Sequence, residues 1–164
     1  MSNHRKNRAK KHLDILLSDF MDVVDYLQNQ NKSQRHKRAK SLLISYIADL
    51  NTHYPSLLRK VLEHKTLSGI QLKLEQLYYF HIQSLCTSNS FHCLIKLFIK
   101  GHDNMVAMID LINDDQWDLH LKTTSTSYKY LTVEDIFCLL IPNDFESQCL
   151  EIIRIIETKN TTPN

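Results

Sequence analysis

Glycine and proline are scarce in this chain, whose 164 residues include only 2 Gly and 3 Pro. Tight β-turns and backbone pressed against a phosphate both rely on glycine, because it adopts unusual backbone angles at little steric cost. The sequence therefore offers few positions for turn-rich β folds. Its hydrophobic content of 43% is ample for a core, and its length suits one domain. Together these features predict a mainly α-helical domain.

Common enzyme and cofactor motifs are also missing. The sequence contains no Gly-x-x-x-x-Gly-Lys-Ser/Thr phosphate loop, no Gly-x-Gly-x-x-Gly fingerprint, no Gly-x-Ser-x-Gly elbow and no His-Glu-x-x-His zinc helix. Active sites can assemble from scattered residues, so these absences reduce the weight of an enzymatic role without excluding it. We expect a non-enzymatic protein with no catalytic residues, no cofactor and no metal.

Cysteine is present but offers no disulfide framework. A chain of this length and apolar content needs no covalent cross-links, so reduced thiols are expected at Cys86, Cys93, Cys138 and Cys149. Soft metal donors gather at His81, Cys86, His92 and Cys93, but their spacing matches no compact zinc site. A thiol nucleophile paired with a histidine stays open as an alternative, and nothing in the sequence selects the pair.

Long apolar runs are absent as well. None approaches the roughly 20 residues that a membrane-crossing helix needs. The apolar stretch 13–17 is interrupted by Asp14 and followed by further aspartates, so no secretory signal peptide is recognisable. The expectation is a soluble intracellular protein of the cytoplasm.

Charge is distributed unevenly, although the formal net charge is only +2. Residues 1–80 carry 14 Lys/Arg against 7 Asp/Glu, and residues 81–164 carry 6 against 11. Two clusters account for the positive excess. The first basic cluster is Arg5, Lys6, Arg8, Lys10 and Lys11, and the second basic cluster is Arg35, Lys37, Arg38 and Lys40. Such clusters favour phosphate-rich or acidic partners.

The first basic cluster precedes the strong apolar periodicity, which predicts a basic mobile arm over residues 1–11, one helical domain over 12–158 and a frayed tail over 159–164. A basic arm can bind nucleic acid through counterion release. Neither cluster contains an aromatic residue for base stacking, and no helix-turn-helix signature is recognisable, so such binding would be mostly non-specific. A solubilising face, a nuclear-import signal and a contact with anionic lipid remain alternatives.

The acidic group Asp110, Asp114, Asp115 and Asp118 lies in the negative half of the chain. It lacks the glycine and the final glutamate of an EF-hand loop, which argues against calcium. It can be a solvated turn, or a patch that contacts a basic partner or the chain's own basic arm. In the last case the arm would be masked.

Apolar residues spaced three and four apart predict a compact irregular bundle of about seven or eight helices. Pro55 suits the first turn of the third helix. The fourth helix is expected to bury Ile70, Leu74, Leu77, Tyr78, His81 and Leu85. A fifth helix should begin at Phe91 and stop at Gly101, with a sixth beginning after Asp103. Thr132 should start a further helix that stops at Pro142, before the last one.

Residues 117–130 break the helical pattern. Trp117, Leu119 and Leu121 alternate with polar residues, and Tyr128 and Tyr130 resume the alternation. This predicts a β-hairpin, which must pack on the helices or pair with another chain because an isolated hairpin is marginally stable. Trp117, Tyr128 and Tyr130 are therefore candidates for partner contact, or anchors of the hairpin on the bundle.

A short segment suggests a second architecture. Residues 101–109, Gly-His-Asp-Asn-Met-Val-Ala-Met-Ile, resemble the second-helix opening of an ankyrin repeat, and residues 150–156 are loosely similar. Ankyrin arrays also repeat a Thr-Pro-Leu-His opening at a period of about 33 residues, and that opening is not found here. A short ankyrin-like solenoid of helix pairs is therefore the alternative to the irregular bundle.

For function, the sequence favours a small non-enzymatic adaptor or regulatory protein that binds another protein through helical faces or the aromatic hairpin. The alternative is a nucleic-acid-associated accessory protein that uses both basic clusters. A steep fall in affinity with salt would distinguish nucleic-acid binding from an apolar protein interface.

Overall fold

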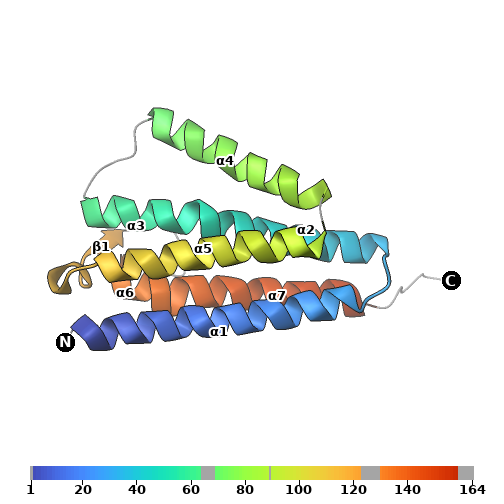
Figure 1. Ribbon diagram of the computed structural model, residues 1–164, viewed down its shortest axis with the longest axis horizontal. Helices are drawn as coiled ribbons and strands as arrows, with labels where there is room; N and C mark the ends of the chain where they lie inside the picture. Colours follow the sequence, from blue (N-terminus) through green and yellow to red (C-terminus); the bar gives the residue numbers. More distant parts are fainter. Residues whose placement is uncertain (1, 64–68, 89, 123–129, 159–164) are drawn as a thin grey trace.

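The computed structural model describes residues 2–63, 69–88, 90–122 and 130–158 (Figure 1). These residues form a mainly helical bundle with one small antiparallel sheet, which confirms the predicted mainly α-helical class but not the predicted seven or eight helices. No helix in these ranges combines the length and the apolar character that crossing a membrane requires. The elements are α1 (Ser2–Gln28), α2 (Gln34–Asn51), α3 (His53–Glu63), α4 (Gly69–Ser88), α5 (Phe91–Leu111), η1 (Asp114–Gln116), β1 (His120–Lys122), β2 (Tyr130–Thr132), α6 (Val133–Asp135), η2 (Ile136–Leu140) and α7 (Ile141–Glu157). Of the two short segments, η1 is a 3₁₀ helix and η2 is a π-helix.

The core lies among α1, α2, α5 and α7, which run side by side along the long axis of the molecule (Figure 1). Between α1 and α5, the rings of Phe20 and Phe98 stack with centroids 3.7 Å apart. Both rings are fully buried, and burial of one such side chain stabilises a fold by about 1.5–3 kcal/mol. The apolar residues of α1, which repeat at three- and four-residue steps, are thus buried on one side of the helix as predicted.

Two buried tyrosines connect the second and third helices to the last one. The Tyr46 hydroxyl of α2 donates to the carbonyl of Ile141 at 3.1 Å, and the Tyr54 hydroxyl of α3 donates to Asp144 Oδ2 at 2.7 Å. Pro55 lies in the first turn of α3, as predicted. Without these hydrogen bonds the two buried hydroxyl groups would have no partner, which would lower the stability of the fold.

The expected break at Gly101 is wrong, because α5 continues through it as one helix. A Cβ at this position would lie 2.8 Å from Asn51 Nδ2 and 3.1 Å from Leu50 Cγ of α2. The absence of a side chain at Gly101 therefore lets α5 lie close to α2. Residues 101–109 lie inside α5, so they do not open a repeat helix, and the ankyrin-like alternative loses its motif.

The last helical segment also differs from its prediction. Its start is as expected: Asp135 N–H donates to Thr132 Oγ1 at 3.0 Å, and Asp135 Oδ2 accepts from Thr132 N–H at 2.9 Å. The expected stop at Pro142 is absent, because α6, η2 and α7 follow one another without a gap. In η2 the helical turn is wider than in an α-helix, because Ile141 N–H donates to the carbonyl of Ile136, five residues earlier. Such a widened turn lets a helix pass a proline.

The predicted hairpin exists as an antiparallel pair, displaced along the chain. Strands β1 and β2 pair with the register His120↔Thr132, Leu121↔Leu131 and Lys122↔Tyr130. Trp117 precedes β1 and lies in the core at the end of η1. Its carbonyl accepts from Glu134 N–H at 3.4 Å, so the hairpin packs on the bundle.

The segment expected as a mobile basic arm is helical here, because α1 begins at Ser2. Ala9 is fully buried and extends the apolar seam toward the N-terminus by one turn from Leu13. Basic side chains on either side of it contact acidic groups of other elements. Residues 159–164, expected as a frayed tail, lie outside the described residues.

Candidate interaction surfaces

The first basic cluster is engaged with the chain's own carboxylates. Arg5 Nη1 lies 3.0 Å from Asp118 Oδ1, and Arg5 Nε lies 3.4 Å from Glu134 Oε2. Arg8 Nη1 contacts the other Glu134 oxygen at 3.3 Å. The hydrogen bond to Asp118 raises the pKa of the Arg5 guanidinium. Part of the positive potential of this cluster is therefore neutralised within the fold.

The acidic group takes part in the same contact. Lys10 Nζ lies 2.6 Å from Asp110 Oδ1, and Lys6 Nζ donates to the Asp110 carbonyl at 2.9 Å. Thus two of the four predicted acidic residues, Asp110 and Asp118, face the chain's own basic segment. Lys11, the last member of the first basic cluster, is exposed.

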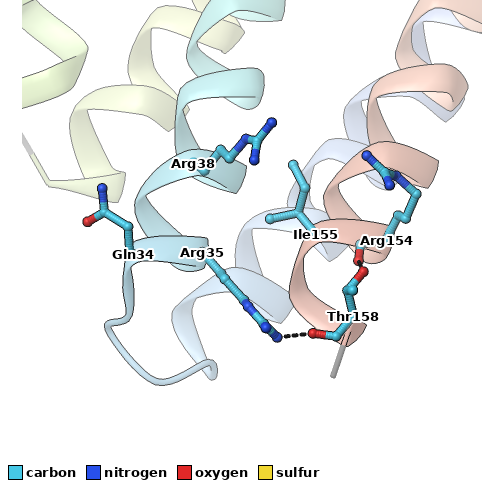
Figure 2. A pocket seen from close by; sticks show the side chains of 6 residues that line it. All are labelled: Gln34, Arg35, Arg38, Arg154, Ile155 and Thr158. Carbon is cyan, nitrogen blue, oxygen red and sulfur yellow. Dashed lines mark hydrogen bonds between the residues drawn. The ribbon is translucent and has the colours of Figure 1, made fainter. Parts of the chain in front are cut away.

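The second basic cluster opens α2 and spreads to two sides of it. Ser33 caps this helix by accepting from His36 N–H at 3.2 Å. On one side lies the arginine pocket, of about 270 Å³, lined by Gln34, Arg35, Arg38, Arg154, Ile155 and Thr158 (Figure 2). Arg35 donates to the Thr158 carbonyl, which ties α2 to the end of α7.

Arg154 brings a third guanidinium to that pocket from α7. It pairs with Glu151 through two hydrogen bonds of 2.7 and 2.6 Å. These bonds lower the pKa of Glu151 and raise the pKa of Arg154. Sequence reasoning missed Arg154, because it lies 116 positions from Arg38 in the chain and only the packing of α7 on α2 brings it near.

On the other side of α2 lies the lysine groove, of about 830 Å³. Its lining residues are Gln28, Lys32, His36, Lys37, Lys40, Ser41, Ile44, Ser90, Phe91 and His92. Lys40 Nζ lies 5.2 Å from the centroid of the Phe91 ring, a distance at which a cation is attracted by an aromatic face. His36 is buried, with Nε2 3.0 Å from the Leu27 carbonyl.

The three aromatic candidates of the hairpin have different surroundings. Trp117 is fully buried, with its ring centroid 6.2 Å from that of Phe137. Tyr130 is 52% exposed, and its ring centroid lies 5.8 Å from that of His120 with the rings nearly perpendicular. Tyr128 lies outside the described residues. Trp117 is therefore an anchor of the hairpin, and Tyr130 is the aromatic side chain accessible there.

The side of the fourth helix that was predicted to be buried faces solvent instead. The residues expected in the core are exposed: Ile70 by 74%, Leu74 by 60%, Leu77 by 65%, Tyr78 by 38% and Leu85 by 38%; His81 is exposed too. The side chains that α4 buries are Ile82 and Cys86. Figure 1 shows α4 at the edge of the molecule, tilted against the other helices.

The physical reason is that α4 has apolar residues almost all round, so its sequence pattern does not select one face. Tyr79 reaches α2, where its hydroxyl lies 2.9 Å from Ser45 Oγ. This contact and the burial of Ile82 set the helix against α2. The predicted apolar stripe then points away from the bundle, a position that sequence reasoning did not foresee.

Three of the four cysteines offer no activated thiol. All four are free, and burial raises the pKa of Cys86, Cys138 and Cys149 to about 11 in each case. A thiol with a raised pKa is protonated at neutral pH and is a poor nucleophile. Within the described ranges, no cluster of three or more His, Cys, Asp or Glu side chains could hold a metal ion.

Comparison of the chain with protein-family models, with curated proteins and with solved structures found no match. What the chain does must therefore be inferred from its own surfaces. Three stand out in the described residues: the exposed stripe of α4, the arginine pocket and the lysine groove.

Proposed function

We propose that this chain is a small non-enzymatic adaptor or regulatory protein that binds another protein through the α4 apolar face. That face consists of Ile70, Leu74, Leu77, Tyr78, Phe80 and Leu85, each at least 38% exposed; Leu72 is 47% exposed on the opposite side of the helix. The observation that carries the proposal is that one side of this helix exposes six large apolar side chains. Single exposed hydrophobic residues are common, but a contiguous patch marks an interaction site.

The size of the α4 apolar face fits a specific interface. Its residues expose on the order of 700 Å², taking about 150–250 Å² for a fully exposed large side chain. The largest apolar patch on a typical monomer is about 300–600 Å², and a standard protein interface buries about 800 Å² per partner. A patch of this area therefore supports stable association.

The shape of the face points to a helical partner. From Ile70 to Leu85 it forms a ridge about 23 Å long, at about 1.5 Å per residue. Of the charged residues of α4, Glu75 is directed to the bundle, where it accepts from the Ser56 hydroxyl at 2.9 Å. An amphipathic helix with an apolar stripe, laid along this ridge, is the partner that such a surface fits.

The test is site-specific photo-crosslinking in cells that produce the full chain. A photoreactive amino acid replaces Leu77 in one sample and, as the control, Leu150 in another; Leu150 is 62% exposed on α7. The expected result is a discrete cross-linked partner at position 77 that is absent at position 150. Adding Leu74→Gln to the position-77 sample should remove that product.

Three outcomes would overturn the proposal. They are identical products at both positions, no product at position 77, and products at position 77 that contain only copies of this chain. The partner's cross-linked peptide, identified by mass spectrometry, should have an apolar helical stripe. When the cross-linking is repeated in cell lysate at high salt, the same product should form, because apolar contacts are not screened by ions.

A second candidate is a nucleic-acid-associated accessory protein, and the arginine pocket favours it. Arg35, Arg38 and Arg154 bring three guanidinium groups around one hollow, and guanidinium groups bind phosphates with two parallel hydrogen bonds. Arg154 is paired with Glu151, and Arg5 and Arg8 of the first basic cluster are paired with carboxylates too, so this candidate depends on Arg35 and Arg38.

This candidate is tested with a duplex oligonucleotide at increasing salt. The double variant Arg35→Gln/Arg38→Gln should weaken binding and flatten the salt dependence, whereas the control Arg5→Gln/Arg8→Gln should bind nearly as the parent chain. Equal losses in both variants, or binding that ignores salt, would reject it.

A further inference from the structure

The lysine groove has a chemistry distinct from the α4 apolar face and from the arginine pocket. Positive side chains stand at its rim, an apolar and aromatic floor lies below, and the first turn of a long helix forms one end. We propose that it binds an organic phosphate, with the phosphate group at the lysines and the apolar or aromatic body on the floor.

The charge at the rim has one sign. Lys32 and Lys37 are exposed, and Lys40 is half-buried over the Phe91 ring. No Asp or Glu occurs among the described residues that line the groove. The groove therefore keeps a positive potential that favours an anion.

The beginning of α5 adds to this potential. Ser90, Phe91 and His92 line the groove where this 21-residue helix starts. The Ser90 side chain makes no capping hydrogen bond, and the first turn contains no acidic residue. The first N–H groups of a helix lack partners within it, and together with the helix dipole they favour negative charge.

The floor indicates that the ligand is larger than phosphate. Ile44 is 5% exposed, and the ring centroids of His36 and Phe91 lie 5.9 Å apart with the rings inclined at 72°. A volume of about 830 Å³ falls within the range of small-molecule sites, which is about 300–1,000 Å³. Inorganic phosphate would leave most of this space to water, whereas an attached apolar or aromatic body would cover the floor.

Calorimetric titration of the full chain tests the proposal with three probes: inorganic phosphate, adenosine monophosphate, and dihexanoyl phosphatidic acid below its micelle concentration. We expect one of the two organic phosphates to bind at least about tenfold more tightly than inorganic phosphate. The nucleotide and the lipid distinguish the two sources of the same group. Weak and equal binding of all three probes would overturn the proposal.

Charge-matched variants locate the site. Lys32→Gln/Lys37→Gln should weaken binding of the preferred probe about tenfold or more, by removing two cations near the phosphate. The control Lys60→Gln/Lys73→Gln removes the same charge from exposed positions on α3 and α4. It should leave the affinity within about twofold. Equal effects of the two variants would show non-specific attraction and reject the site.

A third variant separates binding from folding. Ser90→Asp places a carboxylate at the N-cap of α5, where aspartate is a favourable cap. The melting temperature should hold or rise, while the affinity for the phosphate probe should fall, because the carboxylate competes for the same N–H groups. Undiminished affinity in Ser90→Asp would exclude the helix start from the site.

Discussion

At the residue scale, Gly101 sets how closely α2 and α5 approach. We expect Gly101→Ala to destabilise the fold by up to about 2 kcal/mol, because overpacking costs about 1–3 kcal/mol. The new Cβ would meet Asn51, whose Nδ2 is held by the carbonyls of Ile47 at 2.8 Å and Leu97 at 3.0 Å. This cost exceeds the gain of about 1 kcal/mol that alanine brings to a helix interior. Urea unfolding measures the difference.

The control is Asn104→Ala, at an exposed position of the same helix. It should raise stability by a few tenths of a kcal/mol, through helix propensity alone. If Gly101→Ala were as stable as Asn104→Ala, the two helices would not need a glycine at their contact.

Also at the residue scale, Asp49 should make stability depend on pH. Burial raises the pKa of this carboxyl above its ordinary value of 3.8. A carboxyl with a higher pKa in the folded state favours folding while protonated, and this contribution is lost as pH rises from about 3.8 through the folded pKa. Asp49→Asn should therefore raise the melting temperature at pH 7.

The melting temperatures of both proteins, followed from pH 3 to 8, check this prediction. The difference in favour of Asp49→Asn should grow with pH and then level off. Asp22→Asn, an exposed carboxylate of α1, serves as the control and should show little change. A difference that shrinks toward neutral pH would contradict the prediction.

At the element scale, the first turns of α1 are held by ion pairs that join its start to the hairpin region. Arg5 and Glu134 have side chains 29% and 21% exposed, less than the partners of most surface pairs. A double-mutant cycle with Arg5→Gln and Glu134→Gln should give a favourable coupling that falls with added salt. Thermal unfolding of the four proteins gives this value.

The matched cycle uses Lys10 and Asp110, where the Asp110 side chain is 56% exposed. Its coupling should be smaller, since water screens both groups more strongly. A coupling of zero for Arg5 and Glu134 would mean that the ion pair does not hold the start of α1.

The elements also show how far local pattern leads. The capping pair of Thr132 and Asp135, the position of Pro55 in α3 and the seam of α1 all follow from residues within one or two turns. The orientation of α4 does not, because its apolar residues surround the helix. The packing of α4 on α2 decides it, and this is why the main candidate surface escaped sequence reasoning.

At the scale of the whole molecule, stability should be uneven. Helix α4 packs mainly on α2, whereas α5 packs on both α1 and α2. Regions with fewer buried contacts open at lower free energy. Native-state hydrogen exchange should therefore show faster exchange in α4 than in α5, which has almost the same length. Equal protection of the two helices would contradict this expectation.

The charge pattern of the whole chain has a similar explanation. The sequence separates a positive half from a negative half, and the fold brings parts of them together through Arg5, Asp118 and Glu134. The start of α2 contributes further positive side chains, around the arginine pocket and the lysine groove. The net charge alone shows neither effect.

The sequence by itself determined the helical class, the helix start at Thr132 and the two basic clusters, because these depend on neighbours within a few residues. Only the tertiary structure decided that α5 runs through Gly101, that α1 begins at Ser2 and that Arg154 joins Arg35 and Arg38. It also decided which side of α4 is exposed. These features depend on contacts between residues far apart in the chain, and local periodicity carries no information about such contacts.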